Sequence, residues 1–263
     1  MTRSLCAVID LHSHVLPGVD DGPADLEGSL ALARAAAAAG TRVLAATPHI
    51  GLHYDVAPSG LAAQVGALAL ELERAGVPLE LVGGGELAPT RVMDLSEADL
   101  RATGLGGGRC VLLECPFTPA GELMIRLVAH LQRLGFRVLL AHPERSPTFL
   151  GDLMRLETLV QRGAFVQLTA ASLTGRFGRT VRRFALELLD RGLVHVIASD
   201  AHDVAGRPPE VLSLVAATVT ERRLDPALTA WVCEAVPRAL LDDASVPPGP
   251  DPRPRRRRLL RRP

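Results

Sequence analysis

The chain has 263 residues, of which 48% are hydrophobic and 22% are charged, as is typical of a folded globular protein. Aromatic residues make up only 3%, which argues against a surface of stacking rings, so we expect no specific nucleic-acid binding. The formal net charge is zero, but the 29 basic residues, all arginine, are unevenly distributed. Seven of them lie in residues 253–263, so residues 1–252 hold 22 Arg against 29 acidic residues, a net charge of −7.

The amino-terminal sequence MTRSLCAVIDLHSH lacks the apolar stretch of a signal peptide. No apolar run approaches the roughly 20 residues that span a bilayer. The four cysteines show no paired spacing. We therefore expect a cytoplasmic protein with free thiols.

Short runs rich in Leu and Val alternate with longer segments of helical period. We expect strands at residues 5–11, 42–46, 79–83, 110–114, 137–141, 165–168 and 194–198. Expected helices include residues 26–39, 61–75, 121–134, 150–162 and 181–191. A glycine follows each of these helices, at the position where a left-handed backbone ends a helix: Gly40, Gly76, Gly135, Gly163 and Gly192.

This alternation of seven strands with helices predicts an α/β protein with a parallel sheet in a single domain. The number of units favours a closed barrel, although an open sheet also fits the pattern. After residue 241 the sequence becomes rich in Pro and Arg. We therefore expect a barrel over residues 1–241 and a disordered tail over residues 242–263.

Six of the seven expected strands end in side chains that bind metals. They are His12, His14 and Asp21 after the first strand, His49 after the second, Glu86 after the third, Glu114 at the end of the fourth, His142 after the fifth, and Asp200 and His202 after the seventh. The carboxyl ends of barrel strands form active sites, and residues i and i+2 of a strand face the same side. Imidazole with carboxylate suits zinc, manganese or iron, and so many ligands suggest several ions that share a bridging carboxylate.

Other reactive residue types have simpler interpretations. His53, His130 and His195 are interpreted as structural, with His195 in the core. His53 and Tyr54 either line the entrance to the site or are merely exposed. Neither Cys110 nor Cys115 is followed by the phosphate-binding loop, closed by an arginine, that a cysteine phosphatase needs, so both are expected to be buried apolar residues.

Several motifs, in this order along the chain, resemble the PHP (polymerase and histidinol phosphatase) family, and within it the bacterial capsule-type (CpsB/YwqE-like) tyrosine-protein phosphatases. The motifs are DLHSHVLPGVDDG (10–22), ATPH (46–49), GGE (84–86), LLE (112–114), AHPER (141–145), QLTAASLTGRFG (167–178) and LVHVIASDAH (193–202). The resemblance covers about residues 5–240. It implies a distorted (β/α)7 barrel of the PHP/TIM-like type with three divalent metal ions, which we expect to be manganese, with iron or zinc as alternatives.

The resemblance also assigns roles to residues. His12, His14 and Asp200 would bind one ion; Glu86 would bridge it to a second, completed by Glu114 and His142; Asp21, His49 and His202 would bind the third. Arg145 and Arg207 would neutralise phosphate oxygens, although Arg145 could instead form a salt bridge with Glu144 or another acid. Acidic residues at positions 21 and 114, where histidinol phosphatases of the family have histidine, favour the tyrosine-phosphatase branch.

The implied function is hydrolysis of phosphotyrosine on a protein such as a bacterial tyrosine kinase of polysaccharide synthesis or export. The alternatives are a phosphoesterase for a small molecule, such as histidinol phosphate or a nucleotide, and a non-catalytic metal-binding module. The Arg-rich tail can bind anionic lipid, nucleic acid or an acidic partner, or it can simply be solvated. A weak contact with the inner face of the membrane would suit an enzyme that acts on a membrane-bound kinase.

Overall fold

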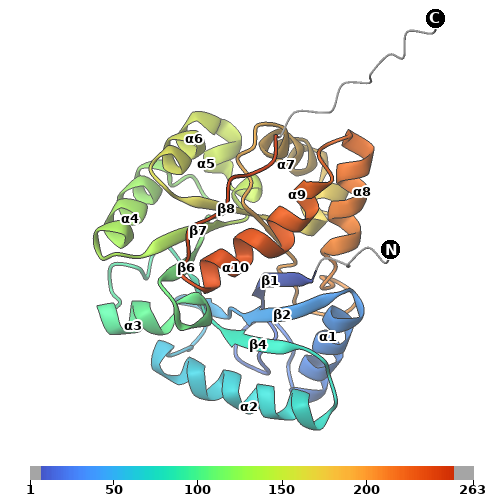
Figure 1. The fold of residues 1–263 in the computed structure, drawn as a ribbon. Coiled ribbons are helices and arrows are strands. Elements are labelled where there is room, and N and C mark those ends of the chain that lie inside the picture. The colour runs from blue at the N-terminus through green and yellow to red at the C-terminus, as the bar shows by residue number, and fades with distance from the viewer. Residues whose placement is uncertain (1–6, 252–263) are drawn as a thin grey trace, which may run out of the picture.

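The computed structural model describes residues 7–251, and its strands follow one another around a ring in parallel register (Figure 1). The strands are β1 (Val8–Ser13), β2 (Thr41–Ala46), β3 (His49–Ile50), β4 (Glu80–Gly83), β5 (Glu86–Leu87), β6 (Cys110–Glu114), β7 (Arg137–Ala141), β8 (Phe165–Thr169) and β9 (Val196–Ala198). They form two sheets, ordered β1-β2-β4 and β3-β5-β6-β7-β8-β9. Five of the seven expected strands begin and end within one residue of their expected bounds; the first starts three residues later and ends two residues later, and the last starts two residues later.

The ring closes between its first and last strands. The backbone N–H of His14 donates to the carbonyl of Ala201 at 2.8 Å, and that of Asp200 donates to the carbonyl of His12 at 2.9 Å. All pairs in both sheets are parallel. The expected α/β barrel in a single domain is therefore confirmed.

The barrel is distorted because two of its strands are interrupted. β3 continues the path of β2 after Pro48, and β5 continues that of β4 after Gly84 and Gly85. At each of these glycines an added Cβ would lie only 2.7 Å from a neighbouring side chain, Leu105 and Ile50 respectively, so a larger residue at either position would force that neighbour to shift. The extensions β3 and β5 carry His49 and Glu86 toward the next strand at the carboxyl end of the barrel.

Helices surround the ring and cover its outer face (Figure 1). The helices are α1 (Leu26–Ala38), α2 (Leu61–Arg74), α3 (Glu97–Ala102), α4 (Gly121–Arg133), α5 (Pro147–Gly151), α6 (Leu153–Gln161), α7 (Arg179–Asp190), α8 (Leu212–Arg222), α9 (Ala227–Ala230) and α10 (Val236–Leu241). The five glycines expected to end helices all have left-handed backbones, with φ between 64° and 102°. Between residues 7 and 251, no helix has both the length and the apolar composition that crossing a bilayer requires.

Alternation along the strands divides the core into two layers. In β6, Val111 and Leu113 pack outward against the helices, while Leu112 packs inside the barrel. The inner layer is closed at the amino-terminal end by α10, which lies across the ring in Figure 1 and contributes Val236 and Leu240. This packing leaves the carboxyl end of the barrel as the place where inward-facing side chains can be polar.

The expected tail differs from the structure over residues 242–250, which lie against the closed end of the barrel. The indole N–H of Trp231 donates to the carbonyl of Pro247 at 3.0 Å, and Arg137 donates to that of Ala244 at 2.9 Å. The carboxylate of Asp243 accepts from the backbone N–H of Arg109 at 3.0 Å. This Pro-rich segment has no helix or strand of its own, and barrel side chains donate hydrogen bonds to its backbone carbonyls. Residues 252–263, the Arg-rich end, lie outside the described residues.

Candidate metal centre

The carboxyl end of the barrel brings all nine of the expected ligand residues together. They form four overlapping groups, and within each group the potential ligand atoms, nitrogen or oxygen, lie within 4.8 Å of one another. Glu86, which is 1% exposed, lies at the centre and belongs to two of these groups. Its Oε2 lies 3.0 Å from Nδ1 of His49 and 3.3 Å from Nε2 of His12.

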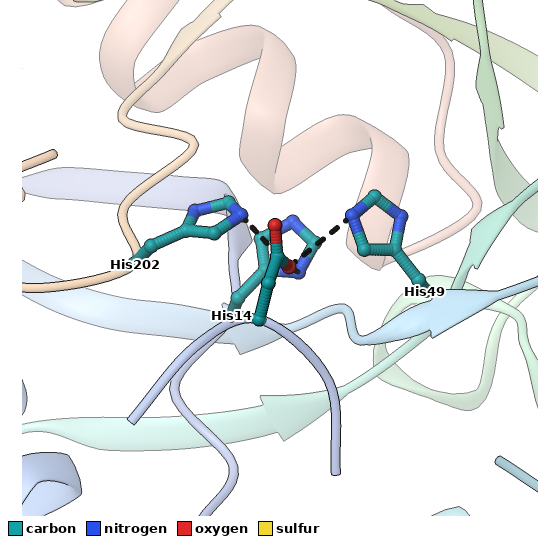
Figure 2. A group of neighbouring side chains, drawn as sticks. His14, His49 and His202 are labelled. Atoms are coloured by element: carbon teal, nitrogen blue, oxygen red, sulfur yellow. Dashed lines mark ion pairs between the residues drawn. The ribbon is translucent and has the colours of Figure 1, made fainter. Parts of the chain in front are cut away.

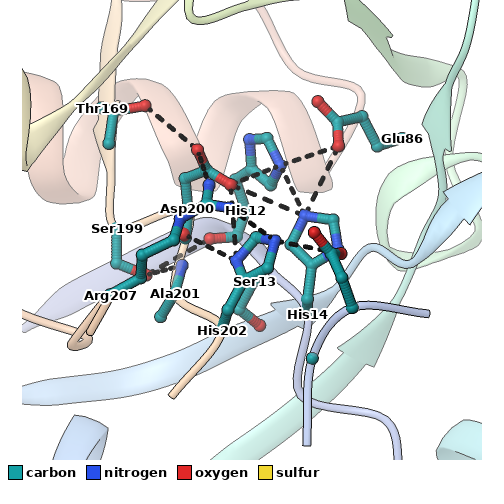
Figure 3. A network of polar contacts seen from close by, with 12 residues as sticks. His12, Ser13, His14, Glu86, Thr169, Ser199, Asp200, Ala201, His202 and Arg207 are labelled. Carbon is teal, nitrogen blue, oxygen red and sulfur yellow. Dashed lines mark hydrogen bonds and ion pairs between the residues drawn. The ribbon is translucent and has the colours of Figure 1, made fainter. Parts of the chain in front are cut away.

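One group consists of His12, His14 and Asp200 (Figure 3). Oδ1 of Asp200 lies 3.4 Å from Nε2 of His12 and 3.6 Å from Nε2 of His14. The two Nε2 atoms are themselves 3.3 Å apart. Because His12 and His14 are two positions apart on β1, both rings face the same side, as the His-x-His spacing predicts.

A second group gathers around the carboxylate of Asp21. Its Oδ1 lies 3.2 Å from Nε2 of His202, 3.4 Å from Nε2 of His49 and 3.8 Å from Nδ1 of His14 (Figure 2). The centroid of the His14 ring also lies 3.9 Å from the centroid of the His202 ring. His14 therefore contributes to two groups, although the sequence resemblance assigned it to one.

The two remaining groups share Glu86. Nε2 of His142 lies 2.8 Å from Oε1 of Glu86 and joins a group with His12. Glu114, at the end of β6, joins a group with Glu86 and His49. The carboxylate of Glu86 therefore faces ligand atoms on two sides, as a bridging ligand does.

Hydrogen bonds to the outer nitrogens of three histidines set the orientation of their rings. Nδ1 of His14 lies 2.7 Å from Oδ2 of Asp20, Nδ1 of His12 lies 3.0 Å from Oε1 of Gln167, and Nδ1 of His202 lies 3.1 Å from the carbonyl of Asp200. Each of these acceptors selects the tautomer with the proton on Nδ1, which leaves the lone pair on Nε2 to bind a metal; in His202 this nitrogen also lies 2.8 Å from NH1 of Arg207, which can donate to it. The sequence reasoning missed this role of Asp20 and Gln167, because Gln167 is 155 positions from its histidine.

The charges of the cluster keep most of its carboxylates ionised. Burial acts to raise the pKa of Glu86, but the charge of His12 and hydrogen bonds from histidines hold it well below its usual range. The pKa of Asp200 is likewise lowered against burial, chiefly by His12, and that of Asp21 by His202 and His49. Burial acts to lower the pKa of His49, yet Asp21 and Glu86 raise it to about 10.

Glu114 behaves differently, because burial and the negative charge of Glu86 raise its pKa to about 7. At neutral pH this carboxyl group is therefore partly protonated. A metal ion that binds here displaces protons from Glu114 and from the histidines, so its affinity depends on pH.

Two residues of the cluster have left-handed backbones that non-glycine residues rarely adopt. The φ of His142 is 38° and that of Asp200 is 54°. His142 directly follows β7 and Asp200 lies two residues after β9, and hydrogen bonds from their backbone N–H groups to β8 and β1 hold them in place. Such conformations persist where the surrounding structure fixes them, and they are concentrated at functional sites.

The two expected catalytic arginines both contact Asp200. NH1 of Arg145 lies 2.9 Å and NH2 of Arg207 lies 2.5 Å from Oδ2 of Asp200. The alternative partner of Arg145, Glu144, faces elsewhere: its buried Oε1 accepts from Ser172 Oγ at 2.6 Å and burial raises its pKa to about 7. Arg145 therefore forms its salt bridge with Asp200 and not with Glu144. Of the two kinds of partner considered in the sequence analysis, Glu144 or another acid, the structure shows the second.

A pocket of 570 Å³ opens above the cluster. Its lining includes His49, Glu86, Glu114, Arg145 and Arg207 together with His53 and Tyr54, so the last two do line the entrance. The ring of Tyr54 stacks on His49, with 5.4 Å between centroids and 8° between planes. Phe117, which the sequence analysis did not single out, also lines the pocket and stacks on His142 at 5.7 Å and 7°. Aromatic side chains thus form two parts of the wall.

His53 lies at the pocket, whereas His195 and the two cysteines are structural residues, as the sequence suggested. His195 lies between Phe165 and Trp231 at the opposite end of the barrel. Cys110 and Cys115 are fully buried free thiols. Burial raises the pKa of Cys110 to about 12 and that of Cys115 well above its usual range, so neither thiol ionises as a nucleophile must.

The donor set fits divalent metal ions. Oε2 of the buried Glu86 has no hydrogen-bonding partner assigned among the described residues, and the Nε2 atoms of His12 and His14 face it at 3.3 and 3.4 Å. A parallel barrel with histidines and carboxylates gathered at its carboxyl end is the arrangement of a metal-dependent hydrolase.

Comparison with known proteins identifies the family within this class. Residues 8–242 match the family described as "Capsular polysaccharide synthesis, CpsB/CapC", and the chain belongs to this family. It is 34% identical over 201 residues to the tyrosine-protein phosphatase YwqE of Bacillus subtilis. The aligned region covers 76% of this chain and 79% of the relative. The chain is 28% identical over 209 residues to the tyrosine-protein phosphatase CpsB of Streptococcus agalactiae, spanning 77% and 86%.

Solved structures agree with this assignment. A chain from the crystal structures of YwqE from Bacillus subtilis and CpsB from Streptococcus pneumoniae, described as unique metal-dependent tyrosine phosphatases, matches with a TM-score of 0.81 and 29% identity. The match covers 95% of this chain and 100% of that one. A dihydropyrimidinase from Brevibacillus agri matches with a TM-score of 0.59, covering 90% of this chain and 71% of that one; at 11% identity the likeness is one of fold alone.

Proposed function

We propose that this protein is a metal-dependent phosphatase that removes phosphate from tyrosine residues of proteins. The observation that carries the proposal is the convergence of nine ligand side chains at the carboxyl end of the barrel, where six of them and the two arginines line one pocket. Family membership supports the same activity, since relatives are named as tyrosine-protein phosphatases.

The cluster suggests how three ions would be held. His12, His14 and Asp200 would bind the first; Glu86 would bridge it to a second, held with Glu114 and His142; Asp21, His49 and His202 would bind the third. The overlap of the four groups at Glu86 and His14 supports ions that lie close together. We propose manganese, with iron or zinc as alternatives that the same donors accept.

Such ions supply positive charge for phosphate oxygens and a reactive nucleophile from water at neutral pH. The chain's own residues position the substrate. Arg145 and Arg207 lie at the pocket with their guanidinium groups on the same carboxylate, Asp200, and each can donate to a phosphate oxygen. The aromatic walls at Tyr54 and Phe117 provide apolar surface for the ring of the leaving phenol.

We propose that the protein substrate is a bacterial tyrosine kinase of polysaccharide synthesis or export, and that the enzyme works in the cytoplasm. A weak contact with the inner membrane surface through the Arg-rich end remains a prediction, because residues 252–263 lie outside the described part of the chain. Family membership in capsular polysaccharide synthesis supports this choice of substrate.

The test compares hydrolysis of a phosphotyrosine peptide with that of histidinol phosphate and a nucleotide monophosphate, with added Mn²⁺ and with excess chelator. We expect the peptide to be preferred and the chelator to abolish turnover. Preference for either small molecule would overturn the substrate class and leave the phosphatase chemistry standing. Protein that binds metal yet hydrolyses none of the three would instead support a non-catalytic metal-binding module.

A further inference from the structure

The guanidinium group of Arg145 lies between two phenylalanine rings. Its central carbon is 4.3 Å from the ring centroid of Phe177 and 4.8 Å from that of Phe117. Arg145 follows β7, while Phe117 follows β6 and Phe177 follows β8 and a short 3-10 helix, η4 (Ala170–Thr174). Since β6 and β8 are the two neighbours of β7 in the sheet, the rings reach the arginine from either side.

The two rings stand differently toward the pocket. Phe117 lines the pocket, exposes 51% of its surface and also stacks on His142. Phe177 is absent from the pocket lining, and its ring contacts the guanidinium group of Arg145. We therefore expect a change at Phe177 to act on the site through the arginine.

A rigid turn holds Phe177 in place. The residues on either side of the Arg176–Phe177 pair are Gly175 and Gly178, whose φ values are 88° and 96°. The N–H of Gly178 donates to the carbonyl of Gly175 at 2.9 Å, and Arg182 donates to the carbonyl of Leu173 at 2.9 Å. This turn is the end of the QLTAASLTGRFG motif, whose first residue, Gln167, orients His12. The proposed chemistry assigns no other role to the turn itself.

Within residues 7–251, the guanidinium group of Arg145 also donates a hydrogen bond from NH1 to Oδ2 of Asp200 at 2.9 Å. One such bond fixes an end of the guanidinium group but leaves its plane free to turn. Two aromatic faces fix the plane, because the cation is attracted to the electron-rich face of each ring. A guanidinium group held in this way presents its remaining N–H groups to a phosphate, and its side chain loses little conformational entropy on binding.

We infer that Phe177 is a positioning residue that, with Phe117, clamps Arg145 in the orientation in which it binds the substrate phosphate. The inference rests on the proposed phosphate-binding role of Arg145. It adds a residue beyond the pocket whose effect passes entirely through that arginine.

The experiment measures binding of inorganic phosphate to the manganese-loaded protein by calorimetry, and hydrolysis of p-nitrophenyl phosphate. Phe177→Leu should weaken phosphate binding and lower kcat/KM by about three- to ten-fold, while Phe177→Tyr, which keeps the ring face, should restore both. In an Arg145→Ala background, Phe177→Leu should cause no further loss in kcat/KM. The matched control is Phe165→Leu, which removes a ring 5.0 Å from Arg137 at the opposite end of the barrel and should leave phosphate binding unchanged.

The result decides between the clamp and a merely structural ring. An equal loss from Phe177→Leu with and without Arg145 would overturn the inference, as would unchanged phosphate binding in Phe177→Leu or no phosphate binding by the unmodified protein. Failure to hydrolyse any phosphate ester, with phosphate binding still sensitive to Phe177, would overturn the phosphatase proposal and leave the clamp intact.

Discussion

Oε1 of Glu86 lies 2.8 Å from Nε2 of His142, a residue 56 positions further along the chain. The other oxygen of the same carboxylate faces His49 and His12 at 3.0 and 3.3 Å. Because its two oxygens face different ligands, Glu86 can serve two ions at once. The strand interruption at Gly84 and Gly85 makes this possible, since it brings β5 beside β3 and β6 at the carboxyl end.

Glu86→Gln should reduce the metal content by more than one ion per chain, because the amide cannot bridge two cations. We expect kcat to fall by at least about a hundred-fold, since a lost bridging ligand disturbs both ions. Metal analysis after gel filtration and steady-state kinetics would measure the two effects. Glu80→Gln, at the exposed start of β4, is the matched control and should change neither. Full metal content in Glu86→Gln would contradict the bridging role.

Removal of the metals should abolish activity and also lower the unfolding temperature. An ion present at a hundred times its dissociation constant stabilises the folded state by about 2.7 kcal/mol. For a chain of this size that corresponds to a shift of about 5–10 °C per ion. Scanning calorimetry with Mn²⁺ and with chelator measures the shift, and restored Mn²⁺ should reverse it. Turnover by protein that analysis shows to be free of metal would contradict a metal-dependent mechanism.

The sequence allowed the strands and the ligand positions to be predicted because both are local properties. Short apolar runs rich in Leu and Val identify β6 and β7, and a histidine or carboxylate at or just after the end of a buried strand marks the carboxyl end of the barrel. The contacts that orient these ligands could not be predicted, because they join distant segments. Gln167 contacts His12, which is 155 positions away in the sequence, and Phe177, which follows β8, contacts Arg145, which follows β7.

Residues 242–250 illustrate a different limit. Their composition is typical of disorder, but composition does not show that the side chains of Trp231 and Arg137 donate hydrogen bonds to backbone carbonyls of this segment. Whether a Pro-rich stretch is ordered thus depends on partners elsewhere in the fold.

Cys115→Ala should retain activity within about two-fold, whereas His142→Ala or Asp200→Ala should abolish it. The Cys115 thiol is buried and its pKa is raised by desolvation and by Glu144 and Glu114, so it supplies no thiolate at neutral pH. Kinetics on a phosphotyrosine peptide, together with treatment by iodoacetamide, would check this. A folded but inactive Cys115→Ala, or rapid inactivation by iodoacetamide, would favour a cysteine nucleophile instead.

His195 makes stability depend on pH at the end of the barrel away from the pocket. Its ring packs between Phe165 and Trp231, and Nδ1 accepts a hydrogen bond from the backbone N–H of Val166 at 3.2 Å. Burial lowers its pKa from the usual 6.5 to about 4. The unfolded chain therefore binds a proton more readily than the folded one between these two values. The stabilising contribution is complete above about pH 6.5 and is lost as the pH falls toward 4.

Between pH 8 and pH 5 this group alone should cost about 2 kcal/mol in the free energy of unfolding. His195→Asn removes the titration, while the amide oxygen can still accept the hydrogen bond from Val166. Urea unfolding of metal-free protein at both pH values would compare the two proteins. The stability advantage of the unmodified protein over His195→Asn should shrink by about 2 kcal/mol on going to pH 5. An advantage that stays the same at both pH values would show that His195 is not the residue that senses the change, since every other titrating group is common to the pair.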